Sequence, residues 1–198
     1  MRHLRERLLF LRAFASHPRL VGALLPTSRR AVRDMLDLAD LPGAHLVVEL
    51  GAGTGVYTQE ILSRLRPDGQ VLALEIDPAM ARQLAERLPD PRLRVACDSA
   101  ERLEEHLSGA TADVVVSALP FTSLGAQVRR AILGQIRAAL APGGEVLVLQ
   151  YSPLIQSELG RIFPSVRRRI SLLNVPPAFL FACTMDPAGA SPAARPRR

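Results

Sequence analysis

The chain has 198 residues, of which 48% are apolar and 22% are charged, and this suits one α/β domain with a full core. No run of eighteen uncharged apolar residues occurs, so a membrane-spanning helix is not expected. The apolar stretch from Leu8 to Leu11 is too short for the core of a signal peptide. We therefore expect a cytoplasmic protein.

The cysteines and histidines argue against a disulfide and a metal site. Cytosolic thiols normally stay reduced, so Cys97 and Cys183 are expected to be two buried thiols. The four histidines are scattered, and no group of Cys and His has the spacing of a zinc site, so no metal is expected.

The net charge of +6 is concentrated at one end of the chain. All 25 basic residues are arginine, and residues 1–33 contain eight of them against one glutamate. A localised basic end favours an anionic partner, either a phosphate backbone or an anionic lipid surface. Arginine without lysine is also what a biased genome composition produces, which carries no functional message.

In chain order, residues 1–27 form a basic arm that is predicted to contain an amphipathic helix. Apolar residues recur in it at helical spacing: Leu4, Leu8, Leu11 and Ala15. Such a helix suits a membrane surface, with leucines in the acyl boundary and arginines at the phosphates. On this interpretation the membrane-binding residues are Arg2, Arg5, Arg7, Leu8, Leu11 and Arg12. The alternative is an ordinary domain helix that packs through Leu8 and Leu11.

Residues 28–185 alternate between strand and helix, the pattern of an α/β domain. Thr27 or Ser28 is expected to cap a helix that runs through Met35 and Leu38. Strands are predicted at residues 46–50, 71–75, 93–96, 113–117, 145–151, 166–173 and 178–184. Further helices are predicted at residues 57–65, 78–88, 100–107, 127–140 and 154–163.

This order of elements predicts a mostly parallel sheet with helices on both faces. The last two strands are expected to be antiparallel to each other. Residues 186–198 are rich in Pro, Ala, Gly and Arg and are expected to form a disordered tail.

The first strand ends in a glycine loop, Gly51-Ala-Gly53-Thr-Gly55, which opens a helix. Glycines let the backbone approach a ligand, and a helix N-terminus supplies free N–H groups, which suits the carboxylate of S-adenosylmethionine (SAM). A dinucleotide-binding loop would carry its third glycine where Val56 stands, and the Lys-Ser/Thr pair of an ATP-binding P-loop is missing. The plain alternative is a tight turn between strand and helix.

Acidic residues at the ends of the next two strands support a SAM site. Glu75 lies 26 residues after Glu49 and is expected to accept both ribose hydroxyls. Ile76 is expected along the adenine, and Asp98 at the adenine amino group, with the Ser99 N–H nearby. Each acid alone is typical of a solvated strand end, but their recurrence at successive strand ends favours one ligand.

Four further segments carry a family resemblance: residues 10–14 (FLRAF), 18–28 (PRLVGALLPTS), 117–121 (SALPF) and 174–178 (NVPPA). Together with the glycine loop they resemble the soluble bacterial phospholipid N-methyltransferases, from the arm to about Thr184. Family members often carry Ser where Thr27 stands and Pro where Ala52 stands. The resemblance implies a Rossmann-like class I methyltransferase fold, a seven-stranded sheet with an antiparallel last strand.

The resemblance also implies an activity and partners. Methyl groups would pass from SAM to the amine of phosphatidylethanolamine and its mono- and dimethylated forms, towards phosphatidylcholine, at the inner face of the cell membrane. Glu49 is implied as a SAM-binding residue, because this acid orients the glycine loop or meets the cofactor's ammonium in similar families. The expected partners are an anionic membrane surface and the lipid, with no nucleic acid, and the oligomeric state stays open.

The segment Ser117-Ala-Leu119-Pro120-Phe121 lies where methyltransferases of this class hold the acceptor nitrogen. Its carbonyls are expected to accept the amine's protons, and Phe121 to present a π face to a cation. Tyr151, at the end of the fifth strand, is expected to place its hydroxyl on the amine or the lipid phosphate. Ser117, Phe121 and Tyr151 are thus the candidate catalytic residues, and Leu119, Pro120 and Phe121 the candidate substrate-binding residues. The alternatives are a core role for Phe121 and strand capping by Tyr151.

Three other functions remain open at this point. An rRNA adenine N6-dimethyltransferase shares the glycine loop and a Leu-Pro-aromatic segment, but usually carries Asn before it, where Ser117 and Ala118 stand here. It also carries a helical RNA-binding domain, for which 198 residues leave no room. The others are a non-catalytic SAM-binding module at the membrane surface and a methyltransferase for a soluble amine.

Overall fold

The protein's structure is a computed structural model that describes residues 28–172 and 177–185. The predicted membrane-binding arm, the predicted tail and most of the Asn-Val-Pro-Pro-Ala segment lie outside the described residues. The division of the chain into arm, domain and tail therefore stays a prediction.

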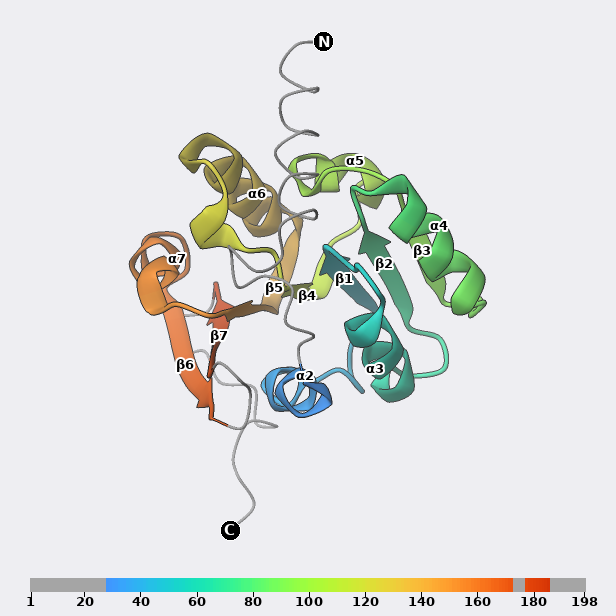
Figure 1. Ribbon diagram of the computed structural model, residues 1–198, viewed down its shortest axis with the longest axis horizontal. Coiled ribbons are helices and arrows are strands. Elements are labelled where there is room, and N and C mark those ends of the chain that lie inside the picture. The colour runs from blue at the N-terminus through green and yellow to red at the C-terminus, as the bar shows by residue number, and fades with distance from the viewer. Residues whose placement is uncertain (1–27, 173–176, 186–198) are drawn as a thin grey trace.

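The described residues form one mixed sheet. Its strands are β1 (Leu46–Leu50), β2 (Gln70–Leu74), β3 (Leu93–Ala96), β4 (Ala112–Ser117), β5 (Leu140–Gln150), β6 (Ser165–Ser171) and β7 (Ala178–Thr184). The seven strands lie in the order β3-β2-β1-β4-β5-β7-β6. Strands β1 to β5 pair in parallel, and β7 is antiparallel to both β5 and β6 (Figure 1). This confirms the predicted Rossmann-like fold.

Helices cover both faces of the sheet. The α-helices are α2 (Arg29–Leu36), α3 (Val56–Arg64), α4 (Pro78–Arg87), α5 (Leu103–Leu107), α6 (Ala126–Ala139) and α7 (Gln156–Ile162). Three short 3₁₀ helices accompany them: η1 (Ala100–Arg102), η2 (Phe121–Ser123) and η3 (Pro153–Ile155). One apolar core joins the sheet to α5, α6 and α7, and a second joins its other face to α2 and α3 (Figure 1).

Local chemistry explains where the helices begin. Ser28 caps α2, because its hydroxyl accepts a hydrogen bond from the Ala31 N–H at 3.1 Å. Asp77 caps α4 in the same way, and Pro78 follows at the first helical position. The helix predicted over residues 100–107 is split into η1 and α5, because the backbone of Arg102 (φ −117°, ψ 23°) leaves helical geometry.

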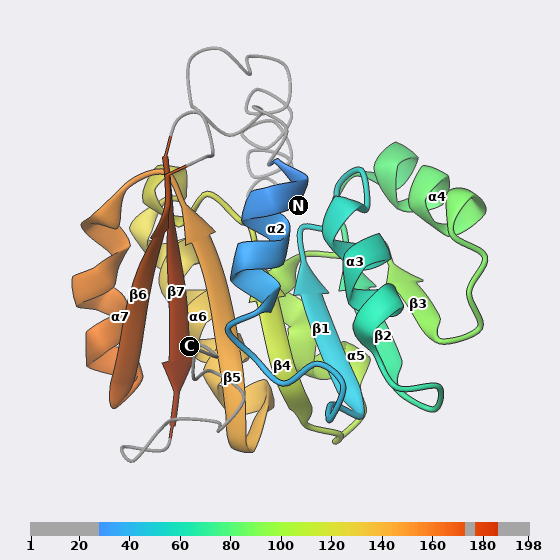
Figure 2. The same cartoon turned by 90° about the horizontal axis from the view of Figure 1, so that it is seen from below.

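All parallel strands end at one edge of the sheet, which we call the carboxyl edge. Leu50 at the end of β1 is in register with Leu74 of β2 and with Ser117 of β4, and Leu74 is in register with Ala96 of β3. In Figure 2 the arrows of β1 and β5 point towards this edge, whereas β7 points away from it. The topology therefore brings the glycine loop and the strand-end acids to one place.

The two thiols differ in burial. Cys183 is buried in β7, and burial raises its pKa to about 12. Cys97 is exposed just after β3, so the prediction of two buried thiols is wrong for this residue. Both are free cysteines. No helix formed by the described residues combines the length and the apolar character that crossing a membrane requires.

Candidate functional site

The glycine loop folds back onto the end of β2. The Gly51 and Ala52 N–H groups both donate to the Leu74 carbonyl, at 2.8 and 3.2 Å. Gly51 has φ +76°, a left-handed conformation that favours glycine, and a Cβ at this position would lie 2.7 Å from a methyl carbon of Leu119. The loop is therefore held against the segment that follows β4, and only a residue without a side chain fits.

Glu75 connects the glycine loop to the end of β2. Its side chain is 7% exposed, with one oxygen accepting the Gly53 N–H at 2.8 Å and the other the Asp77 N–H at 2.9 Å. Each carboxylate oxygen has about two acceptor sites, so one on each oxygen remains for a ligand hydroxyl. This arrangement suits the predicted hydrogen bonds from the two ribose hydroxyls to Glu75. Ile76, the residue expected along the adenine, follows directly and is half-buried.

Glu49 lies beneath the loop with an unsatisfied oxygen. Its side chain is 2% exposed, and the Thr58 hydroxyl of α3 donates to its Oε2 at 2.6 Å. Its Oε1 is buried and has no hydrogen-bond partner in the part of the chain that the structure describes. Burial raises the pKa of Glu49 to about 8. The hydrogen bond from Thr58 lowers this pKa, and the nearby charge of Glu75 raises it by a smaller amount. Once Glu49 is ionised, its Oε1 needs a donor, and a ligand ammonium would supply it and stabilise the charge.

The pKa of Glu49 makes folding stability fall as the pH rises. The folded chain keeps this proton up to about pH 8, whereas the unfolded chain releases it near 4.5, so stability is lost between these values. We expect wild type to lose up to about 1.4 kcal/mol per pH unit in this window relative to Glu49→Gln. Urea unfolding of both proteins from pH 5.5 to 8.5 measures the difference. A constant gap across this range would show that Glu49 titrates normally.

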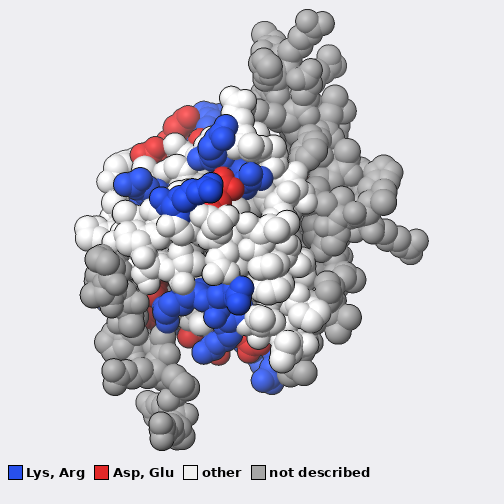
Figure 3. All heavy atoms as spheres, turned by 90° about the vertical axis from the view of Figure 1, so that its left-hand side faces the viewer, with Lys and Arg blue, Asp and Glu red and all other residues white. Residues whose placement is uncertain are grey.

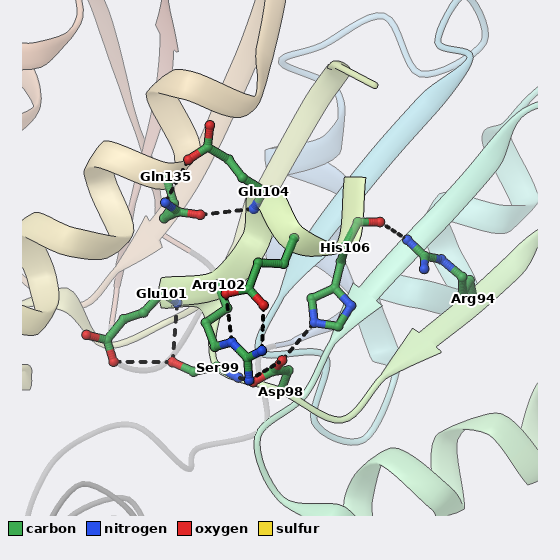
Figure 4. Close-up of polar contacts among 9 residues, drawn as sticks. Arg94, Asp98, Ser99, Glu101, Arg102, Glu104, His106 and Gln135 are labelled. Atoms are coloured by element: carbon green, nitrogen blue, oxygen red, sulfur yellow. Dashed lines mark hydrogen bonds and ion pairs between the residues drawn. The ribbon is translucent and has the colours of Figure 1, made fainter. Parts of the chain in front are cut away.

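Asp98 lies at the end of β3 within a network of charged groups (Figure 4). His106 Nε2 lies 2.8 Å from its carboxylate, Arg102 Nη1 lies at 3.2 Å, and the Ser99 N–H donates to its Oδ1 at 2.8 Å. Burial opposes ionisation, but the hydrogen bonds from His106 and Ser99 and the charge of Arg102 hold the pKa of Asp98 below its usual value. The Ser99 N–H and the Asp98 carboxylate bond each other in this structure. Their contacts with adenine remain predictions.

Two carbonyls of the segment after β4, those of Leu119 and Pro120, are already bonded. The Leu119 carbonyl accepts from Gln150 Nε2 at 2.7 Å and from the Phe121 N–H at 2.8 Å. The Pro120 carbonyl accepts the N–H groups of Ser123 and Leu124 at 2.8 and 3.2 Å. A carbonyl oxygen has two lone pairs, so neither carbonyl is available for the protons of an amine in this arrangement.

Two further candidate residues are structural. Phe121 is fully buried in the core beneath α6, so its ring presents no face to a ligand cation. Ser117 is also fully buried, and its hydroxyl accepts the Leu119 N–H at 3.3 Å. Both side chains are closed off by packing, so their predicted roles in catalysis find no support in this geometry.

Tyr151 and Gln150 lie side by side in sequence at the end of β5. The Tyr151 hydroxyl is buried and forms no hydrogen bond with any described residue. Gln150 is 3% exposed and fixes the Leu119 carbonyl, a positioning role that the sequence analysis missed. The available signal was a lone amide that directly follows the apolar run of residues 146–149 in β5. Thr58 was missed too, and nothing in its sequence position indicates its bond to Glu49.

Comparison with known proteins identifies the family of the chain. A family model described as "Methyltransferase domain" matches residues 47–144. An ornithine lipid N-methyltransferase of Singulisphaera acidiphila is 32% identical over 188 residues, which cover 91% of this chain and 96% of the relative. The fold and site thus define a class I methyltransferase, and the chain belongs to the SAM-dependent methyltransferases.

Other similarities are more distant. The N-methyltransferase NodS of Bradyrhizobium japonicum WM9, solved in complex with S-adenosyl-L-homocysteine, is 14% identical with a TM-score of 0.65, and the match covers 78% of this chain and 85% of that one. This likeness concerns the fold alone. A ribosomal RNA small subunit methyltransferase A of Dehalococcoides mccartyi is 31% identical over 127 residues, or 62% of this chain and 41% of that protein.

The residues at the carboxyl edge fit SAM as the cofactor. Glu75 has spare acceptor sites for hydroxyls, and the buried Oε1 of Glu49 lacks a donor. A Cβ on Gly53 would meet nothing closer than 3.6 Å, so the loop leaves room above it. When bound, SAM supplies an electrophilic methyl group on a sulfonium.

Proposed function

We propose that this protein transfers methyl groups from SAM to the amine of a membrane lipid, namely phosphatidylethanolamine and its mono- and dimethylated forms, towards phosphatidylcholine. The observation that supports this most strongly is the 32% identity to a lipid N-methyltransferase over 91% of the chain. A match of that extent includes the segment after β4 and the end of β5, where the acceptor would lie.

The reaction requires a neutral amine in line with the methyl group. An alkylammonium with a pKa near ~10.4 has no lone pair at neutral pH, so the lipid amine must lose a proton. Burial of the amine lowers its pKa and favours this loss. We assign the Tyr151 hydroxyl, which is buried and has no hydrogen-bond partner among the described residues, as the acceptor of an N–H of the amine once the lipid enters the site. Holding the reactants in line contributes about 7–11 kcal/mol.

We expect Tyr151→Phe to lower kcat about 10- to 100-fold while the affinity for SAM stays within about twofold, as loss of one hydrogen bond to a reacting group predicts. The ring that packs at the end of β5 is retained in this variant, so the fold is preserved. Steady-state kinetics on lipid vesicles, with calorimetric SAM titration, separate the two effects. An unchanged kcat would exclude a role for the hydroxyl.

Ornithine lipid is the second candidate substrate, because the relative that covers 91% of the chain is named for it. Its headgroup also carries a primary amine, so the same site chemistry applies. RNA is less well supported, since the ribosomal RNA methyltransferase matches only 62% of the chain.

The test uses the full chain and methyl-labelled SAM with one of four acceptors: ribosomal RNA, or vesicles that contain phosphatidylethanolamine, ornithine lipid, or only phosphatidylcholine and phosphatidylglycerol. We expect label in phosphatidylethanolamine and none in the last vesicles, which lack a methylatable amine. Label in ornithine lipid alone would show that ornithine lipid is the substrate instead of phosphatidylethanolamine. Label in RNA would show that the protein is an RNA methyltransferase. SAM binding without transfer to any acceptor would support the non-catalytic alternative.

A further inference from the structure

The exposed large apolar residues of the described chain share one location. They are Val56 (36% exposed), Leu154 (76%), Ile170 (43%) and Leu172 (74%). Val56 begins α3 directly after the glycine loop, and Leu154 lies in η3 directly after β5. Ile170 and Leu172 lie at the end of β6 and just beyond it. Because β5 and β6 are both antiparallel to β7, β6 runs in the same direction as β5. All four residues therefore lie at or just beyond the carboxyl edge.

The strand register places β6 at the level of the site. Ile170 is in register with Phe179 of β7, which is in register with Gln150, the last residue of β5. The Ser171 hydroxyl donates to Asp34 of α2 at 2.9 Å, which ties the end of β6 to this helix. The apolar side chains on β6 thus lie at the same edge as Tyr151.

Exposed arginines lie on α2 and β6 at the same edge of the sheet. Arg29 and Arg30 begin α2, and Arg29 lines a shallow hollow between α2 and α3 together with Val56. Arg169 is exposed on β6, next to Ile170 in the sequence. Figure 3 views the side of the molecule on which β6 and α7 lie, where arginine side chains gather in two groups, each with acidic side chains beside it, and uncharged surface separates the two groups.

The charge of the carboxyl edge is divided. The half formed by β1, β2 and β3 carries the acids Glu49, Glu75 and Asp98, which suit a cationic sulfonium. The half formed by α2 and β6 carries the exposed arginines, with Asp34 as a partly exposed acid 3.9 Å from Arg30 Nε. Large apolar side chains separated by arginines are typical of surfaces that insert into the headgroup region of an anionic bilayer.

We propose that the half of the carboxyl edge formed by Arg29, Arg30, Val56, Leu154, Arg169, Ile170 and Leu172, the docking rim, binds an anionic lipid surface. The inference rests on the proposed function and adds the orientation of the protein on the membrane. The apolar residues enter the acyl boundary, the arginines contact phosphates, and the site faces the headgroups, so an amine lipid reaches Tyr151 without leaving the bilayer.

A fluorescence experiment tests the orientation in the full chain. An environment-sensitive probe is attached to Leu172→Cys or, as a control at the opposite edge, to Arg137→Cys in the last turn of α6, both with Cys97→Ser because Cys97 is exposed. With phosphatidylglycerol-containing vesicles we expect a blue shift at position 172 and none at 137. Vesicle-bound protein without a shift at 172 would overturn the proposal, because another surface would then carry the binding.

A partition experiment measures the contribution of the rim. Leu154→Ser with Leu172→Ser is expected to weaken partition onto anionic vesicles at least tenfold, while Arg137→Glu changes it less than threefold. SAM affinity of the double variant should equal that of wild type. Equal partition of all three proteins, or concentration-dependent self-association that the double variant abolishes, would contradict a lipid-facing rim. If wild type bound vesicles through the rim but methylated no lipid, the proposed function would be rejected and the lipid-facing rim would stand.

Discussion

Glu75→Gln is expected to weaken SAM binding by about 100-fold and to lower the melting temperature. A hydrogen bond to a charged group contributes about 1.5–3 kcal/mol, and about 3 kcal/mol lost across two ribose hydroxyls corresponds to this factor. The amide also brings an NH₂ group towards the Gly53 or Asp77 N–H, both of which are donors. Calorimetric titration with SAM measures the affinity, and thermal unfolding measures the stability.

Glu86→Gln is the matched control for this substitution. Glu86 is exposed on the neighbouring helix α4, so the same loss of one negative charge occurs away from the carboxyl edge. We expect its SAM affinity to stay within about twofold of wild type, since exposed charges interact weakly through water. If Glu75→Gln bound SAM as tightly as this control, the ribose would not lie at Glu75.

Gly51→Ala is expected to reduce SAM affinity at least tenfold and to destabilise the fold by about 2–3 kcal/mol. The left-handed backbone costs about 1–2 kcal/mol for a residue with a Cβ. The new methyl would lie 2.7 Å from Leu119 Cδ2, so the Leu119 side chain must move, and with it the contact between the loop and the segment after β4. Urea unfolding and SAM titration measure the two effects.

Gly134→Ala provides the control for Gly51→Ala. Gly134 lies within α6, and a Cβ there would meet no other atom within 4 Å. Alanine is the better helix former by about 1 kcal/mol, so this variant is expected to be slightly more stable and to bind SAM normally. Comparable losses in both glycine variants would mean that the loop is not specially constrained.

The backbone features of the site were predictable because they follow from local chemistry. The glycine loop, the acid at the end of β2 and the alternation of strands and helices each depend on short stretches of sequence. Parallel strands then bring Glu49, Glu75 and Asp98 to one edge without further information. The prediction of the sheet, including the antiparallel final pair, holds for the same reason.

The side-chain roles after β4 were not predictable, because they depend on which face of the backbone each residue occupies. Phe121 has the type expected for a cation-binding ring, but the turn after Pro120 directs it into the core. The carbonyl of Leu119 is occupied by Gln150, a residue 31 positions away in sequence. Asp98 is engaged by His106 and Arg102 across a turn that splits one predicted helix into two.

A crystal structure of the full chain with S-adenosyl-L-homocysteine would test the central claim most directly. The geometry predicts ribose hydroxyls within hydrogen-bond distance of both oxygens of Glu75 and the ligand's ammonium at the unbonded Oε1 of Glu49. A nucleoside bound away from the carboxyl edge, or bound there without contact to Glu75, would contradict the account.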